Sequence, residues 1–209
     1  MPTPDDLLVD GPEAAPLTVV LAHGAGAPMH TPFMNAIARG LAGGGLRVVR
    51  FEFPYMRARR QTGARRPPDR EPVLRQAWLD VITGLGGGGR LVIGGKSLGG
   101  RMASLVADEA AVRGLVCLGY PFHPPGQLAR LRTAHLATLR TPTLIVQGTR
   151  DPFGTPSDVA GYDLSPQIRI EWIPEADHSL APSVRARGAN ETMNQVVSAV
   201  LAFLRNVAG

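Results

Sequence analysis

The chain has 209 residues, 44% of them hydrophobic, which excludes a disordered protein and suits one α/β domain over residues 1–209. The formal net charge is +5, yet Lys96 is the only lysine, so the abundance of arginine does not by itself indicate phosphate recognition. A single cysteine, Cys117, excludes an internal disulfide, and the absence of a signal-peptide pattern or a ~20-residue apolar run predicts a cytoplasmic protein without membrane contact.

The first part of the chain alternates apolar runs with helical patterns. Residues 17–22 predict a buried strand that ends at the small-residue segment 23–26. Apolar residues at helical spacing then predict a helix that stops at glycines 43–45, and a strand over residues 46–51 follows. We expect the arginine-rich segment 57–70 to be a long loop, followed by a helix over about residues 73–85.

The second part continues this alternation. Strands are predicted at residues 91–93, 114–118, 143–147 and 168–173, with a last helix around residues 196–204. His135 falls in a segment where we expect a helix. Continuous apolar strands that alternate with helices predict an α/β fold, a doubly wound and mostly parallel sheet with helices on both faces. Ligands of such sheets bind beyond the carboxyl ends of the strands.

The most informative segment runs from Gly94 to Arg101, directly after the apolar residues 91–93. It contains a Gly-x-Ser-x-Gly pattern centred on Ser97 and opens a helical pattern at Leu98. A strand, a tight glycine turn and a helix are the context of a nucleophile elbow, which exposes a serine hydroxyl at the tip of the turn. The N–H groups at the start of the helix favour developing negative charge. Ser97 is therefore a candidate nucleophile.

Two other local structures are compatible with residues 94–101. A Walker A phosphate loop would need a glycine five positions before Gly95, where the sequence has Arg90. A glycine-rich turn with an unreactive serine is also compatible with so short a motif. Residues elsewhere in the chain favour the nucleophile.

A serine hydroxyl needs a base that removes its proton, and a histidine oriented by a carboxylate is suited to this near neutral pH. Asp151 and His178 each follow the end of a predicted strand, in the order serine, acid, histidine. His123 precedes the acid, so we expect it to line the pocket instead. The other acids that we considered are less well placed, because Asp151 alone lies immediately beyond a strand; they are Asp158, Asp163, Glu175 and Asp177.

An oxyanion hole needs two N–H groups. One is expected from Leu98, the residue after the nucleophile, and the other from Ala25, with Gly26 as the second choice and as a candidate for contacting the substrate. The pattern Gly24-x-Gly26 could also open a dinucleotide loop, but the third glycine of that motif is replaced by Met29.

Six arginines fall between residues 57 and 70, with Asp69 as the one acid among them. They form a positive patch or a solvated loop, and Arg59 and Arg60 are candidates for contacting an anionic substrate. Tyr55 is the one aromatic residue nearby, which argues against nucleic-acid binding.

Taken together, the chain resembles a small α/β-hydrolase of the lidless, dienelactone-hydrolase-like kind, especially the compact family described simply as predicted α/β-hydrolase. The resemblance covers almost the whole chain and rests on residues 23–26, 51–56, 66–68, 94–104, 119–126, 147–154 and 177–179. It implies the α/β-hydrolase fold and the triad Ser97, Asp151 and His178, but no particular substrate. Only residues 119–142 separate the strands between which many such enzymes carry a cap, so no cap domain is expected.

We therefore expect a serine hydrolase that cleaves a small or short-acyl carboxylic ester, or a related acyl bond, through an acyl-enzyme. No metal or other cofactor is needed for this chemistry. The alternative is a non-catalytic binding or scaffold protein on a hydrolase fold that uses the arginine-rich segment 57–70 as its contact surface. Some eukaryotic relatives look like subunits of larger assemblies, which keeps this alternative open. The sequence indicates no oligomeric state.

Overall fold

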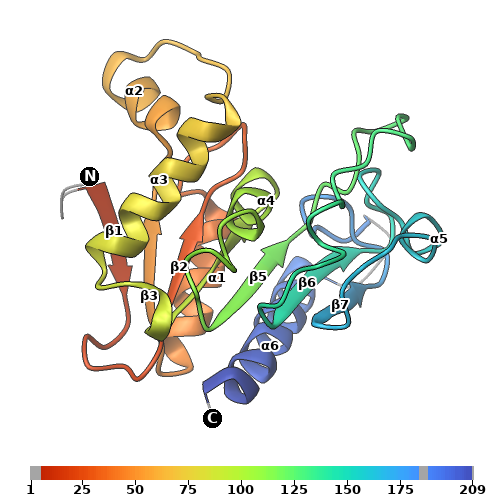
Figure 1. The fold of residues 1–209 in the computed structure, drawn as a ribbon. Helices are drawn as coiled ribbons and strands as arrows, with labels where there is room; N and C mark the ends of the chain where they lie inside the picture. The colour runs from red at the N-terminus through yellow and green to blue at the C-terminus, as the bar shows by residue number, and fades with distance from the viewer. Residues whose placement is uncertain (1–5, 184–187, 209) are drawn as a thin grey trace.

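The structure is a computed structural model that describes residues 6–183 and 188–208. Seven strands form one sheet in the order β1-β3-β2-β4-β5-β6-β7 (Figure 1). All neighbours are parallel except the edge strand β1, which pairs antiparallel with β3. The strands are β1 (Leu7–Asp10), β2 (Thr18–Ala22), β3 (Arg47–Phe51), β4 (Leu91–Lys96), β5 (Gly114–Leu118), β6 (Thr143–Gly148) and β7 (Ile168–Ile173).

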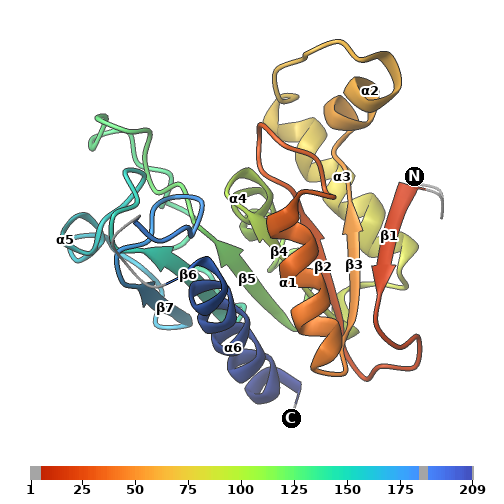
Figure 2. The same cartoon turned by 180° about the vertical axis from the view of Figure 1, so that it is seen from behind.

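Helices cover both faces of the sheet, as Figures 1 and 2 show from opposite sides. α1 (Pro32–Gly43) and α6 (Ala189–Ala208) pack on one face, and α3 (Glu71–Gly84) and α4 (Leu98–Ser104) on the other. The alternation of side chains along β2 illustrates this arrangement. Val19 and Leu21 face α1 and α6, whereas Val20 and Ala22 face α3 and α4. With both faces buried, the central strands are continuous apolar runs, and the expectation of a doubly wound sheet is confirmed.

Close approach of α1 and α6 depends on a small residue. A methyl group added at Gly40 would lie 2.7 Å from a methyl carbon of Val197, so glycine lets the two helices pack tightly. At the start of α1 the Thr31 hydroxyl accepts the N–H of Met34, and Pro32 occupies the first turn. This cap fixes the residue at which α1 begins after the loop that follows β2.

Two expectations about the connections are wrong. The segment 57–70 is not a loop throughout, because α2 (Pro54–Thr62) includes its first part. Proline in the first turn and Gly63 in the left-handed region at the end bound this helix, which buries Tyr55 and Met56. His135 lies in a turn, not in a helix, where Leu136 donates its N–H to Thr133.

The remaining elements are short. η2 (Gly88–Arg90) is a single 3₁₀ turn before β4, and α5 (Pro156–Val159) begins with a capping box between Thr155 and Asp158. Residues 119–142, between β5 and β6, contain turns but no helix, so no lid domain is inserted there. This segment and α2 both extend beyond the ends of the strands (Figure 1).

Candidate active site

Ser97 lies directly after the central strand β4, at the point where α4 begins. Its φ of 49° and ψ of −108° place a non-glycine residue in a sparsely populated conformation, which costs on the order of 1–3 kcal/mol. A Cβ atom at Gly95 would meet the carbonyl oxygen of Ala22, and one at Gly99 would meet the same oxygen. The two glycines of the motif therefore let the turn pack against the end of β2.

Ser97, His178 and Asp151 form one chain of hydrogen bonds although three different strands carry them. The Nε2 atom of His178 lies 2.8 Å from the hydroxyl oxygen of Ser97. Its Nδ1 atom lies 2.8 Å from Oδ2 of Asp151. An ionised carboxylate only accepts, so Nδ1 carries the proton and Nε2 is free to accept the serine hydroxyl. This tautomer is the one in which the imidazole is suited to act as a base.

Asp151 is completely buried, and protein groups satisfy its carboxylate. Oδ1 accepts the N–H of Phe153 at 2.8 Å, and Oδ2 also accepts the side-chain amide of Gln147 at 2.8 Å. A buried carboxylate without such partners would carry a large desolvation cost. The hydrogen bonds therefore hold both its charge and its orientation toward His178.

The histidine loop is fixed from two sides. The ring of Phe153 packs on the imidazole of His178 with 4.1 Å between the ring centres. Asp177, an alternative acid in the sequence, does not face the imidazole, because its Oδ1 accepts the N–H groups of Ser179 and Ala181. Asp177 thus shapes the turn that carries His178.

The loop after β2 is oriented by His23, which is completely buried. Its Nε2 accepts the N–H of Phe53 at 3.1 Å, so Nδ1 carries the proton and donates to the carbonyl of Gly24 at 2.7 Å. Burial lowers the pKa of His23 and keeps this ring neutral. The hydroxyl of Tyr55 donates to the carbonyl of Ala25 at 2.9 Å. Because a trans peptide directs its C=O and N–H in opposite directions, the N–H of Ala25 points away from His23.

A cavity of about 440 Å³ opens beside Ser97 and His178. Its walls are the loop after β2, the start of α1 and the ring of Phe153, and its lining includes Ala25, Gly26, Phe33 and Met34. This volume and this apolar lining are typical of a site for a small organic ligand. Among the described residues, no cluster of three or more His, Cys, Asp or Glu side chains could hold a metal ion. In the same part of the chain, no helix is long and apolar enough to span a membrane.

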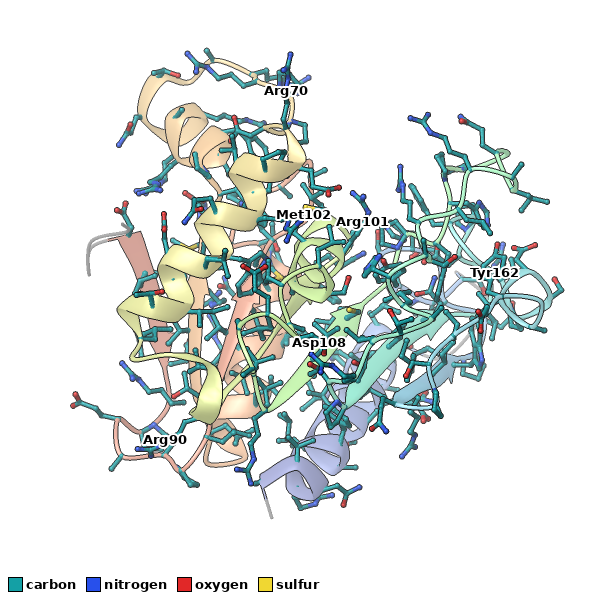
Figure 3. All side chains as sticks on the ribbon, in the orientation of Figure 1. Arg70, Arg90, Arg101, Met102, Asp108 and Tyr162 are labelled. Atoms are coloured by element: carbon teal, nitrogen blue, oxygen red, sulfur yellow. The ribbon has the colours of Figure 1, made fainter. Side chains whose placement is uncertain are left out.

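Of the other predicted binding residues, Gly26 lines this cavity, whereas the side chains of His123, Arg59 and Arg60 do not. His123 is buried and lies near Asp158 and Tyr162, beside α5, where Figure 3 labels the tyrosine. Its ring does not line the cavity at Ser97, because Nδ1 lies 2.9 Å from the carbonyl of Pro124 and turns it elsewhere. Arg60 binds the buried carboxylate of Glu52 at 2.9 Å and so holds α2 on the end of β3.

Arg59 alone of the two arginines reaches the loop beside the cavity, where it donates to the carbonyl of Gly26 at 3.3 Å. Leu98 is the first residue of α4, so its N–H has no acceptor within the helix. Sequence reasoning missed two residues of the site, Gln147 behind Asp151 and Lys96 beside Ser97. Both lie in segments that carry the family resemblance, 94–104 and 147–154, but no sequence pattern gives either residue a role at the site.

A lidless, mostly parallel sheet with a serine at a strained turn after its central strand defines the α/β-hydrolase class of fold. The chain belongs to the corresponding family, because a family model described as an alpha/beta hydrolase domain matches residues 15–205. It is therefore a member of a hydrolase family.

Solved structures show the same fold. A lidless α/β serine hydrolase from Xanthomonas campestris superposes with a TM-score of 0.70 at 21% identity, covering 96% of this chain and 88% of that chain. For dienelactone hydrolase from Anabaena variabilis the TM-score is 0.74 at 20% identity, with 96% and 90% covered. For Est1E from Butyrivibrio proteoclasticus it is 0.71 at 14% identity, with 96% and 94% covered. At these identities the likeness concerns the fold alone.

Proposed function

We propose that the protein is a serine hydrolase that cleaves small or short-acyl carboxylic esters, or related acyl bonds. The observation that carries this proposal is the continuous hydrogen-bond chain from the Ser97 hydroxyl through His178 to the buried Asp151. Solved structures of similar fold that are named as an esterase domain and as dienelactone hydrolase support acyl chemistry as well. The substrate is a small molecule, and no cofactor takes part.

In the proposed reaction the Ser97 oxygen attacks the ester carbonyl while His178 Nε2 takes the hydroxyl proton. The new C–O bond gives a tetrahedral intermediate, and His178 then returns the proton to the leaving alkoxide as the acyl–oxygen bond breaks. Water, activated by the same histidine, hydrolyses the acyl-enzyme to the acid and restores the serine. Asp151 keeps the imidazole in its tautomer and stabilises the imidazolium in both steps.

Two backbone N–H groups are available for the oxyanion of the intermediate. One is that of Leu98, free at the start of α4, and the other is that of Ala25. The Ala25 N–H is directed away from His23 because His23 holds the Gly24 carbonyl. Removing one donor of such a pair costs other enzymes roughly 10²–10³ in kcat, so this loop contributes much of the proposed catalysis.

Labelling with a fluorophosphonate probe tests the proposal, because the probe reacts with an activated serine. The wild type should be labelled, and Ser97→Ala should lose the label and roughly 10³-fold or more of its ester hydrolysis. Ser104→Ala is a matched control, since the Ser104 hydroxyl also lies 2.8 Å from a histidine, His135. Burial and Arg101 lower the pKa of His135 to about 4, which makes it a poor base, so this variant should label normally.

Labelling that survives in Ser97→Ala would show that the nucleophile is misassigned. A folded wild type that neither labels nor hydrolyses any ester would reject the hydrolase and favour the binding role of segment 57–70.

A further inference from the structure

Lys96 places an ammonium group next to the proposed nucleophile. Its side chain lines the same cavity as Ser97 and passes between two glycines. A methyl group added at Gly24 would lie 3.6 Å from Lys96 Cγ, and one added at Gly119 would lie 2.9 Å from Nζ. A side chain at residue 119 would therefore crowd the ammonium group, whereas the contact at residue 24 is an ordinary van der Waals one.

The ammonium group of Lys96 is hydrogen-bonded to the main chain of His178, the proposed general base. Lys96 Nζ donates a hydrogen bond of 2.6 Å to the main-chain carbonyl of His178. A charged donor gives such a bond roughly twice the strength of a neutral one. His178 is thus held through its ring by Asp151 and through its main-chain carbonyl by Lys96. Lys96 is also the residue that precedes Ser97 in the chain.

The surroundings make the charge of this lysine sensitive to pH. Burial lowers the pKa of Lys96 from its ordinary value to about 8, while the nearby carboxylates of Asp151 and Asp177 act to raise it. The elements around it also carry His178, His23, whose ring burial keeps neutral, and Arg101 on α4. Cys117 on β5 and the nearby Tyr120 have pKa values that burial raises, so both are neutral over this range. The ammonium is therefore charged at neutral pH and neutral a few pH units above it.

We propose that Lys96 is a positioning residue for the general base, and that its ammonium group fixes the main chain of His178 so that the imidazole reaches the Ser97 hydroxyl. This inference rests on the proposed serine hydrolase function. It predicts that losing the charge, by mutation or at high pH, lowers kcat more than it changes KM. A misplacement of about 1 Å can cost 10²-fold in rate, so a 10- to 100-fold loss is expected.

The test compares the pH dependence of kcat and KM for wild type and Lys96→Met on a short-acyl ester between pH 6 and 10. Methionine keeps a chain of similar length without the charge. Wild-type kcat should fall above pH 8, whereas Lys96→Met should be 10- to 100-fold slower at pH 7, with KM changed less than about threefold, and flat above pH 8. Arg90→Met is the control variant that also loses one positive charge, because Arg90, labelled in Figure 3, directly precedes β4, whereas Lys96 is the last residue of that strand. It should keep the wild-type profile.

Stability measured over the same range separates positioning from unfolding. The folded pKa of Lys96 lies below its ordinary value, so the unfolded chain binds more protons above pH 8 and this group makes the fold more stable as pH rises. Wild type should therefore gain stability relative to Lys96→Met between pH 8 and 10 while its kcat falls. An alkaline loss of kcat that persists unchanged in Lys96→Met would overturn the inference, as would a variant with wild-type kcat at pH 7.

A readout without turnover distinguishes this inference from the proposed function. The Nδ1 proton between His178 and Asp151 gives a downfield NMR signal when the ring is held, and it should broaden or shift in Lys96→Met but not in Arg90→Met. If wild type hydrolyses no ester yet shows this difference, the proposed function fails and the positioning by Lys96 stands. If wild type hydrolyses esters and the signal is the same in Lys96→Met, the inference alone fails.

Discussion

Replacing Gln147 should weaken both the fold and the proposed reaction, because its side chain joins Asp151 to a neighbouring loop. Gln147 is fully buried in β6, and its amide donates to Asp151 Oδ2 at 2.8 Å while its Oε1 accepts the N–H of Tyr120 at 2.7 Å. Gln147→Leu leaves the Tyr120 N–H without a partner, at about 1–3 kcal/mol, and removes a bond to a charged oxygen worth about 1.5–3 kcal/mol. The sum, about 2.5–6 kcal/mol, is a large part of the ~5–15 kcal/mol that keeps a domain folded.

The same substitution leaves Asp151 held by Phe153 and His178 alone, so we expect kcat to fall roughly 10- to 100-fold. Urea unfolding gives the stability, and kcat is measured at a temperature where the variant is still folded. Thr143→Val is the control, because Thr143 is also buried in β6 and its hydroxyl donates to the carbonyl of Thr141, away from Asp151. It should lose about 1 kcal/mol and keep its kcat. A folded Gln147→Leu protein with wild-type kcat would refute the reasoning.

Two further predictions concern the acid and the arginine beside the cavity. Asp151→Asn should lower kcat roughly 10³–10⁴-fold, whereas Asp177→Asn should keep kcat within about threefold because the amide oxygen can still accept the N–H bonds of the turn. The reverse pattern would show that the acid is misassigned. Arg59→Ser should lower kcat/KM for acidic esters more than for neutral ones, since its guanidinium lies beside Gly26 at the cavity wall. Equal losses on both kinds of ester would leave Arg59 without a role in substrate choice.

The elements that the sequence predicted are those whose signal is local. β2, β5 and β6 are buried along their whole length, so their apolar runs identify them without any knowledge of their neighbours. β1 has four residues, lies at the sheet edge and is only partly buried, so it carries no such pattern. α2 was missed because its arginines suggest a solvated loop, while a proline and a glycine set its bounds.

The candidate site likewise contains residues that the sequence predicts and residues that it does not. Ser97, Asp151 and His178 follow strand ends, and parallel strands bring their carboxyl ends to one edge, so chain order sufficed to select them. Gln147 and Lys96 act through contacts with segments 27 and 82 residues away in the chain. No periodicity records such pairs. His123 illustrates the opposite case. It follows the end of β5, but a position after a strand end does not determine the direction in which a side chain points.

The acyl-chain preference should follow from the shape of the cavity. Each buried CH₂ is worth about 0.8 kcal/mol, or roughly fourfold in kcat/KM, for as long as the acyl chain finds apolar wall. Here the wall is short, with Phe33, Met34 and Phe153 as its large apolar members, and residues 119–142 add no lid over it. Across p-nitrophenyl esters from acetate to palmitate, we therefore expect kcat/KM to rise over the first few methylenes and then level off or fall. A rise that continues steadily beyond octanoate would require a longer apolar channel than this cavity of about 440 Å³ provides, and would contradict a preference for short acyl groups.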